Sequence, residues 1–381
     1  MTGAAPIGSR PGSWNTGECA TASQKPYWVP FAHGARDCGD LWDEWRRLCA
    51  DAPPFLQPEF FDLSRPIAEP AGEAYLAVAV RAGQVAGVLP LTLQGRDLHP
   101  LRSEHCLRFD FWGDSGALSA IWEALRADAR WDRLVLGHIP AASALATELP
   151  MLASSWGCLV KTSPSQGVPY FPLPGFEAQL DSKFRTNVRR CMRKAGDLCF
   201  ERLASPSTAD FADALAIEAM AWKGEAGTSI SSDARLAHFY RGLLDVFGPR
   251  GSMSLNFVTV AGQRIACLFT FEDGHTLYAA KIGFDPAFAA LSPGHLMVAE
   301  TATDAESRGL EVFDFLGAAS EWKLKWTNRV REHVWAVVHR PSLRGCARFV
   351  WRKARGSHFS QESLTTMRQT KSPSDLKPNP T

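Results

Sequence analysis

The chain of 381 residues lacks the long apolar runs of membrane proteins and the short motifs of several enzyme classes. No stretch reaches the roughly 18 apolar residues that a membrane-spanning helix needs, so stable membrane insertion is not expected. The sequence contains no Walker A loop and no strand followed by G-x-G-x-x-G, which leaves nucleotide hydrolysis and dinucleotide redox chemistry without support. Neither H-E-x-x-H nor G-x-S-x-G occurs, so neither a zinc protease nor a serine hydrolase is indicated.

Cysteine is present but lacks any metal-binding or disulfide pattern. The nine cysteines are scattered, and none belongs to a C-x-x-C pair or to a Cys/His cluster with zinc spacing. The N-terminus has no continuous apolar segment of the signal-peptide type. We therefore expect reduced thiols, a cytoplasmic protein and metal-free chemistry. Because 41 basic residues nearly balance 40 acidic ones, the net charge argues neither for nor against nucleic acid as a partner. We expect no nucleic-acid partner other than tRNA, and that only under one alternative given below.

The length of the chain favours two domains, because a typical domain has roughly 150 residues. Both ends are rich in small and polar residues, as in disordered tails. A proline-rich stretch, 164–174, precedes the expected boundary. The predicted organisation is a disordered tail (1–27), an N-terminal lobe (28–178), a C-terminal catalytic lobe (179–345), and a terminal helix with a second disordered tail (346–381).

Two segments with alternating apolar residues predict similar β-hairpins, at 75–93 and 255–271. Each consists of a strand, the turn Ala-Gly-Gln, and a second strand. Helical segments precede both hairpins, and a helix and a further strand follow each of them. A repeat of roughly 180 residues favours internal duplication of one α/β unit. The alternative is a chance similarity of two ordinary hairpins.

The segment 277–317 predicts a strand, a loop, a helix and a second strand. Ser292 suits the N-cap of the helix, Pro293 suits its first turn, and Gly309 suits its C-terminal end. The amides at the helix start, from Gly294 through His295 and Leu296 to Met297, lack partners within a helix and lie at its positive dipole end. This start could bind an anion such as pyrophosphate, or it could simply begin a helix without a ligand.

Several of these motifs together resemble the CelD-like acyltransferases, a family of GNAT relatives annotated around cellulose and exopolysaccharide synthesis. The resemblance spans 28–340 and is most specific from Ser292-Pro-Gly to Trp326. Its motifs are Phe55-Leu-Gln-Pro-Glu-Phe60, Gly87-Val-Leu-Pro-Leu91, Phe109-Asp-Phe111, Lys183-x-Arg185 with Arg189-Arg190, Gly283-Phe-Asp285, Leu291-Ser-Pro-Gly-His-Leu296, Gly309-Leu310, Phe313-Asp-Phe-Leu-Gly317 and Trp322-Lys-x-x-Trp326.

The resemblance implies a mixed α/β fold of two tandem GNAT-like N-acyltransferase lobes, as in the related Fem-type aminoacyltransferases, with the active cleft in the second lobe. It implies that the strands 277–283 and 311–316 diverge, so that the pantetheine arm of a thioester donor pairs with the first strand, which includes Tyr278. The usual GNAT phosphate loop has several close glycines, whereas 288–294 has one. The donor could therefore be acyl-CoA, an acyl carrier protein, or aminoacyl-tRNA.

Asp314 is the candidate general base. Strand alternation places it on one face with Val312 and Leu316, where burial would raise the pKa of its carboxyl group. The alternative role is structural, because a buried carboxylate could hold the loop 317–321. Lys281 and Lys323 could neutralise the thioester oxyanion or a donor phosphate, or could be surface charges.

A basic stripe covers 183–194, where six of twelve residues are Lys or Arg. Arg185, Arg189 and Arg193 recur at four-residue spacing, which places them on one helix face. The stripe could bind donor phosphates, an acidic carrier protein or tRNA, or could be a solvated helix face. Three further residues, Trp222, Trp326 and Glu321, are the candidate substrate-binding residues.

The sequence thus predicts an N-acyltransferase that moves an acyl group, which could be a fatty acyl group, from a thioester to an amine. The reaction would proceed by direct attack in a ternary complex, with an amino sugar, an amino acid or a peptide Lys or ornithine side chain as acceptor. Two alternatives stay open, a Fem-type transferase that uses aminoacyl-tRNA and a catalytically degenerate GNAT pair that serves as a binding module.

Overall fold

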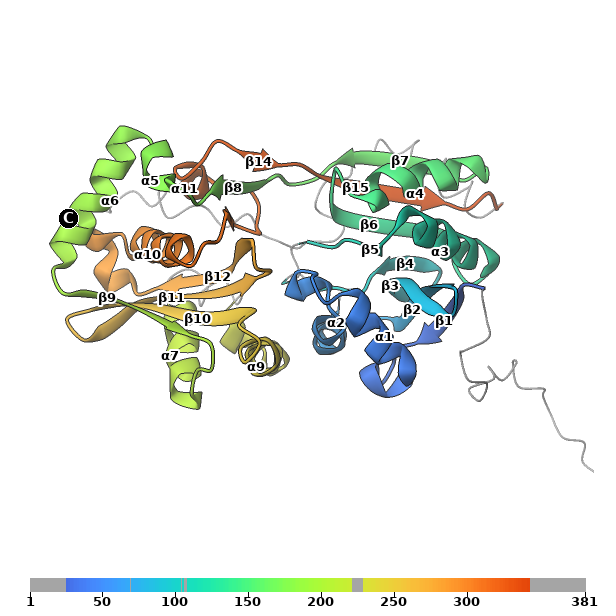
Figure 1. Cartoon of the computed structure of the whole chain (residues 1–381), viewed down its shortest axis with the longest axis horizontal. Helices are drawn as coiled ribbons and strands as arrows, with labels where there is room; N and C mark the ends of the chain where they lie inside the picture. Colours follow the sequence, from blue (N-terminus) through green and yellow to red (C-terminus); the bar gives the residue numbers. More distant parts are fainter. Residues whose placement is uncertain (1–24, 69, 104, 106–107, 221–228, 343–381) are drawn as a thin grey trace, which may run out of the picture.

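A computed structural model describes residues 25–68, 70–103, 105, 108–220 and 229–342, which form two mixed β-sheets (Figure 1). The first sheet has the order β1 (Tyr27–Pro30), β2 (Glu73–Arg81), β3 (Gln84–Gln94), β4 (Asp97–Pro100), β6 (Arg133–Pro140), β15 (His333–His339) and β7 (Leu159–Pro164), and β5 (Trp112–Gly113) pairs with β3. The second has the order β9 (Leu198–Leu203), β10 (Met253–Val260), β11 (Gln263–Glu272), β12 (Thr276–Phe284), β13 (Val312–Asp314), β8 (Val168–Pro172) and β14 (Val330–Arg331).

The helices are distributed over both sheets. Their bounds are α1 (Asp40–Leu48), α2 (Pro58–Ser64), α3 (Ser115–Ala127), α4 (Ala144–Ser155), α5 (Phe176–Gln179), α6 (Ser182–Ala195), α7 (Thr208–Ala219), α9 (Ala234–Phe247), α10 (Pro293–Ser307) and α11 (Glu321–Leu324). Short 3-10 helices are η1 (Gly34–Asp37), η2 (Pro54–Leu56), η3 (Arg65–Ile67), η4 (Ile230–Ser232) and η5 (Pro286–Leu291).

The two sheets have the same strand order and the same pairing directions. In each, four consecutive strands are antiparallel, and the fourth of them pairs in parallel with the next strand, β4 with β6 and β12 with β13. A helix precedes the second strand of each pair, α3 in the first sheet and α10 in the second. An antiparallel strand then follows, β15 beside β6 and β8 beside β13. This correspondence favours duplication over chance similarity of two hairpins.

The turns of the two predicted hairpins have the same geometry. Ala82 and Ala261 both have φ of 50°, and the glycines after them have φ of 77° and 78°. Two successive residues with positive φ are typical of the type I′ turn, whose twist suits a two-residue hairpin. The register also shifts at the same point, leaving one extra residue in each second strand, Ala86 and Ile265. Both hairpins were correctly predicted from alternation and the Ala-Gly turn.

The sheets exchange one strand each across the boundary predicted at residue 178. β8 comes before that boundary but lies inside the second sheet, between β13 and β14. β15 comes from the predicted C-terminal lobe but lies inside the first sheet, between β6 and β7. Figure 1 shows the red β15 among the strands of the first lobe. The sheets are therefore not made of the contiguous segments 28–178 and 179–345, and β1 begins within the predicted tail, at Tyr27.

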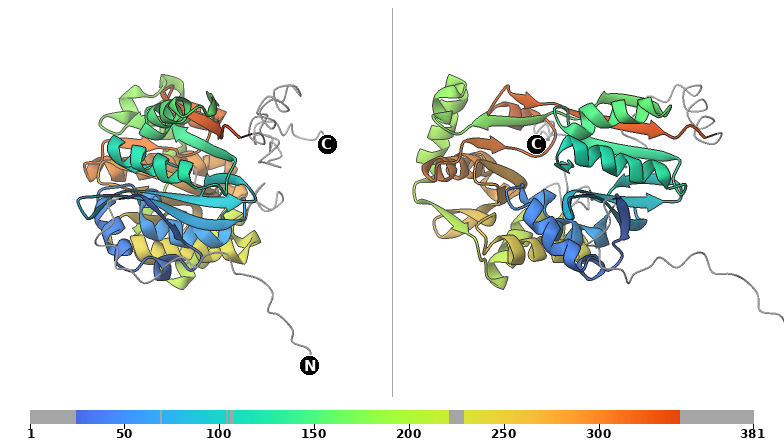
Figure 2. Two further views of the ribbon diagram at one scale, coloured as in Figure 1. Left: turned by 90° about the vertical axis from the view of Figure 1, so that its right-hand side faces the viewer. Right: turned by 45° about the vertical axis from the view of Figure 1, so that its right-hand side comes forward.

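Two layers of helices cover the second sheet. On one face, α10 packs against β10, β11 and β12, and α6 packs against α10 and η5. On the opposite face, α7 packs on β11 and β12, while α9 packs on β10. Figure 2 shows α6 at the end of the second lobe that is far from the first lobe.

The first lobe contributes directly to this opposite face. The Phe55 ring of η2 lies 5.0 Å from the Tyr278 ring of β12 and 6.3 Å from the Phe271 ring of β11. Phe60 of α2 contacts Phe239 of α9 with ring centroids 5.5 Å apart. One buried apolar cluster thus continues from the first lobe onto the second sheet, next to β12.

Candidate functional site

The strands β12 and β13 run side by side for only three residue pairs. The last of these pairs is Tyr278 with Asp314, although β12 continues to Phe284. Among the described residues, 279–284 pair with β11 only, and a bulge at Ala280 lies just beyond the divergence. Bulges are common next to functional sites, where they redirect side chains. The divergence agrees with the prediction from the sequence.

The helix α10 begins at Pro293, after Ser292 in the left-handed conformation (φ 53°, ψ 56°). The Ser292 side chain makes no capping bond, and the Ser292 carbonyl accepts the amides of both His295 and Leu296, at 2.9 and 3.2 Å. Two of the amides predicted to be free are therefore engaged within the helix. Because proline has no N–H, the Gly294 amide is the first that this helix start could offer to an anion.

His295 projects from this first turn into an aromatic cluster. Trp326 Nε1 donates to His295 Nδ1 at 3.2 Å, which places the imidazole proton on Nε2. The Phe184 ring lies 5.0 Å from the imidazole. Burial, assisted by the charge of Lys325, lowers the pKa of His295 to about 4. His295 is therefore neutral near pH 7, and the buried Trp326, stacked on Phe171, is a wall of this cluster.

Asp314 is almost completely buried where the strands part. Its Oδ1 accepts the Leu316 amide at 2.8 Å, and its Oδ2 accepts Arg331 Nη1 at 3.0 Å. Burial raises the pKa of the Asp314 carboxyl, while Arg331 opposes the rise. The carboxylate holds Leu316, whose φ is 50°, so a structural role is visible. The raised pKa is equally what a general base for an amine requires.

Lys281 lies on the face of β12 that α7 covers. Its Nζ is 3.4 Å from Glu218 Oε1, and Glu218 Oε2 accepts the Ile230 amide at 2.8 Å. The Glu218 side chain is 0% exposed, and that of Lys281 is 16% exposed. We did not predict Glu218 as a site residue from the sequence. The signal was available, because Glu218 follows Ala214 and Ile217 at helical spacing and so belongs to the buried face of α7.

The other predicted residues are distributed over two faces of the sheet. Lys323 Nζ donates to the Phe315 carbonyl at 3.4 Å, and Glu321 is exposed at the start of α11. Tyr278 donates to Asp273 Oδ2 at 2.6 Å on the face toward Phe55, away from α10. Trp222 lies outside the described residues.

The basic stripe forms the exposed face of α6, beside α10 and η5. Arg185 donates to the Glu177 carbonyl at 3.1 Å, and Arg189 pairs with the Glu177 carboxylate at 2.6 Å, so both tie α6 to α5. The remaining basic side chains are exposed, namely Lys183, Arg190, Arg193 and Lys194.

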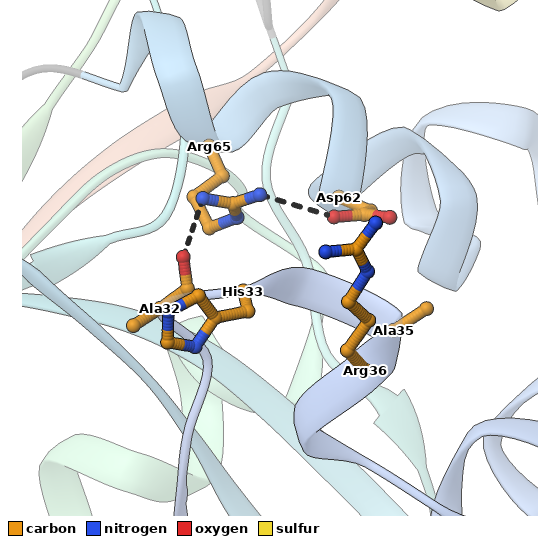
Figure 3. Close-up of a pocket in the computed structure, with 6 residues that line it drawn as sticks. All are labelled: Ala32, His33, Ala35, Arg36, Asp62 and Arg65. Carbon is orange, nitrogen blue, oxygen red and sulfur yellow. Dashed lines mark hydrogen bonds and ion pairs between the residues drawn. The ribbon is translucent and has the colours of Figure 1, made fainter.

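A surface pocket of about 440 Å³ lies on the first lobe and is lined by Ala32, His33, Ala35, Arg36, Asp62 and Arg65 (Figure 3). Arg65 donates to the Ala32 carbonyl at 2.6 Å and lies 3.6 Å from Asp62. None of these residues belongs to β12, β13 or α10, so the pocket is separate from the diverging strands.

In the described part of the chain, no cluster of three or more His, Cys, Asp or Glu residues could hold a metal ion. No described helix has both the length and the apolar character of a membrane span.

The arrangement of two mixed sheets with a diverging parallel pair defines a GNAT-like fold. Residues 182–324, from α6 to α11, match the acetyltransferase (GNAT) domain family. This segment contains β12, β13 and α10. The matched domain makes the protein an enzyme of the GNAT acyltransferase class. No curated protein gives a significant match to the sequence.

Solved structures share the fold across both lobes. FemX superposes with a TM-score of 0.57 at 12% identity, covering 77% of this chain and 95% of FemX. A conserved protein of unknown function from Bacteroides thetaiotaomicron VPI-5482 gives 0.55 at 12% identity, covering 78% and 97%. The C-terminal DUF2156 domain of a candidate lysylphosphatidylglycerol synthetase from Agrobacterium fabrum gives 0.53 at 13%, covering 82% and 95%.

Proposed function

We propose that the protein is an N-acyltransferase that moves an acyl group from acyl-CoA or an acyl carrier protein to an amine. The observation that carries this proposal is the end of β12–β13 pairing at Tyr278 and Asp314. Beyond it, the edge of β12 facing β13 has backbone groups that an extended pantetheine arm could pair with, as a peptide pairs with a sheet edge. The thioester would then lie where the strands part, next to Asp314.

The proposed chemistry is direct displacement. The amine nitrogen attacks the thioester carbonyl carbon, the C–N bond forms, and the C–S bond breaks to release the thiolate. Asp314 accepts the proton that the nitrogen loses, directly or through water, and the thiolate takes up a proton from solvent. Lys281 and Lys323, which belong to the same lobe, would stabilise the oxyanion electrostatically. No acyl-enzyme intermediate forms in this scheme.

The donor's anionic end would lie toward the start of α10. The Gly294 amide and the exposed face of α6 offer positive charge there, because α6 packs against both α10 and η5. One amide and a solvated basic helix suit a carrier protein presenting a phosphopantetheine arm at least as well as free CoA. The acceptor would be an amino sugar, an amino acid or a Lys or ornithine side chain of a peptide.

A second candidate function is aminoacyl transfer from tRNA, as the Fem-type alternative implies. The specific observation in its favour is the basic face of α6, since phosphate backbones bind to such surfaces.

A cytoplasmic location and membership of the CelD-like family are further parts of the proposed function. The first is supported by the free thiols of the described cysteines and the second by the motifs around Ser292 and Trp326.

A donor screen with mass-spectrometric detection tests the proposal. The purified full chain is incubated with acyl-CoA donors of increasing chain length, or with acyl carrier protein, and with amines of the three classes. An acylated amine together with equimolar free thiol is the expected result. Transfer only from aminoacyl-tRNA, with binding that weakens steeply as salt rises, would establish the second candidate instead. Absence of both transfer and thioester binding would refute the enzyme assignment for this chain.

A further inference from the structure

Arg108 is a cation at the lobe junction with incomplete hydrogen bonding. Its side chain is 19% exposed, and its Nη2 lies 3.8 Å from the carboxylate oxygen Oδ2 of Asp110. The guanidinium carbon lies 5.9 Å from the centroid of the Phe55 ring. Arg108 Nε is buried and has no hydrogen-bond partner among the described residues. A buried donor without a partner is costly, so groups of this kind call for an explanation.

Contacts lead from Arg108 directly to the proposed reaction centre. Phe55, which Arg108 overlies, contacts Tyr278 with ring centroids 5.0 Å apart. Tyr278 is the strand partner of Asp314, and Arg331 Nη1 bonds the Asp314 carboxylate. Arg331 also stacks on Tyr170, with its guanidinium carbon 4.6 Å from that ring, and its side chain keeps 32% exposure. The first lobe thus supplies one guanidinium and the second lobe another, on the same side of β12.

His333 adds an acceptor to this junction. Its Nδ1 lies 3.2 Å from the Arg331 carbonyl, so Nδ1 carries the proton and Nε2 keeps a lone pair. That Nε2 is buried, with no hydrogen-bond partner among the described residues, in a side chain only 3% exposed. Burial and the charges of Arg108 and Arg331 lower the pKa of His333, which keeps the imidazole neutral.

These groups are complementary to ligands of one chemical class. An unpartnered guanidinium N–H needs an oxyanion, and an unpartnered histidine lone pair needs an N–H donor. The Asp314 carboxylate, already bonded by Leu316 and Arg331, is the nearby group that can take a proton. We propose that the lobe junction binds an acceptor that carries both an amine and an anionic group, either carboxylate or phosphate. Arg108 binds the anion, and the amine is directed toward Asp314 and His333. This inference rests on the proposed function and names the substrate class that the same site selects.

The fork geometry of arginine explains why Arg108 rather than a lysine suits the role. A guanidinium binds a carboxylate or phosphate through two parallel hydrogen bonds, which fixes the orientation as well as the position of the anion. The partial exposure of both arginine side chains leaves them accessible from solvent. Asp110 and Asp314 are the carboxylates in contact with these arginines, and neither contacts Arg108 Nε.

Ligand binding can be tested without any assumption about catalysis. The melting temperature of the full chain is measured in sodium phosphate, in sodium acetate and in sodium chloride at equal ionic strength. We expect phosphate or acetate to raise it above the chloride value for the wild type and for the control Arg130→Gln, but not for Arg108→Gln. Arg130 is a suitable control because it is also half-buried and ion-paired, with Asp128 in the first lobe. Equal stabilisation of Arg108→Gln and wild type, or none in the wild type, overturns the inference.

Acceptor kinetics then identify the anion. Glycine is compared with glycinamide, and glucosamine 6-phosphate with glucosamine. We expect kcat/KM to favour one anionic member by roughly 10- to 100-fold, as hydrogen bonds to charged groups allow. In Arg108→Gln this ratio should fall toward one, mainly through a higher KM. Arg108→Lys keeps the positive charge but cannot form two parallel hydrogen bonds, so we expect an intermediate ratio. This variant takes the place of Arg108→Gln in the test if Arg108→Gln does not fold. Unchanged ratios in these variants refute the site, whereas anion binding without any transfer refutes only the proposed function.

Discussion

Tyr278 and Asp314 are the last residues that the parallel strands β12 and β13 hold side by side, and both are buried. Pairing between β12 and β13 therefore ends at these two residues. Tyr278 is anchored by its hydrogen bond to Asp273, and Asp314 by those from Leu316 and Arg331. Both anchors hold side chains rather than joining the strands further on, and in the described part of the chain the edge of β12 beyond this point has no strand partner on the β13 side.

Replacing Asp314 by asparagine separates its two roles. Asparagine keeps an oxygen that can accept the Leu316 amide, but it cannot take a proton, so we expect kcat to fall about 100-fold or more. Asp132→Asn is the matched control, because Asp132 is equally buried and paired with Arg96 in the first lobe. If Asp314→Asn transfers acyl groups at the wild-type rate, the base assignment is wrong and the carboxylate is structural.

The Lys281–Glu218 pair should contribute to stability, because Glu218 is wholly buried. Removing one partner leaves the other charge buried, which typically costs about 3–5 kcal/mol. We expect Lys281→Met to lower the free energy of unfolding by an amount at the lower end of that range, since Lys281 keeps some exposure. The double variant Lys281→Met/Glu218→Gln should recover part of the loss. Urea denaturation of the single and double variants measures the coupling.

Additive effects in that cycle would show that the two side chains do not interact. A surface pair provides the comparison: Arg235 and Asp233 lie 2.7 Å apart, yet both are exposed. Exposed pairs contribute about 0–1 kcal/mol, so Arg235→Gln should change stability little.

Local features of the fold were predictable, whereas the pairing between distant segments was not. Alternation and an Ala-Gly turn are properties of neighbouring residues, and they predicted both hairpins correctly. The positions of β8 and β15 depend on partners far along the chain. Their sequences, VPYFP and HVWAVVH, fit a strand in either sheet, so nothing local specifies the exchange.

Part of the candidate site was also predictable from the sequence, and part of it was not. Burial of Asp314 followed from strand alternation, and the divergence of the strands followed from the family resemblance. The bond from the Leu296 amide to the Ser292 carbonyl is the ordinary first bond of a helix with Ser292 as its N-cap. The left-handed conformation of Ser292 after η5 could not be foreseen from the sequence. Arg108 and Arg331 come from different lobes, and no sequence spacing indicates that the charges of both act on Asp314.

Acid should destabilise the fold through His295. Its pKa is lowered from 6.5 to about 4 by burial, so between these values the unfolded chain binds more protons than the folded one. The free energy of unfolding therefore falls as pH falls from 6.5 to 4, by at most about 1.4 kcal/mol per pH unit for this group. His99 and His138 are lowered likewise and add to the slope. In His295→Gln the slope should decrease, because only two of these imidazoles remain. Chemical denaturation at several pH values measures it, and an unchanged slope would contradict the assignment.

The strand exchange predicts that the segment 179–345 does not fold alone. Without β8, the strand β13 loses its antiparallel partner and β14 loses its only described one, while β15 has neither β6 nor β7 to pair with. Unpaired backbone groups at the centre of a sheet are costly, so we expect a fragment without cooperative urea unfolding. Co-expression with 25–178 restores both sets of partners and should yield a soluble complex with the far-UV circular dichroism of the full chain. Cooperative unfolding of 179–345 by itself would show that the predicted boundary defines an independent domain despite the exchanged strands.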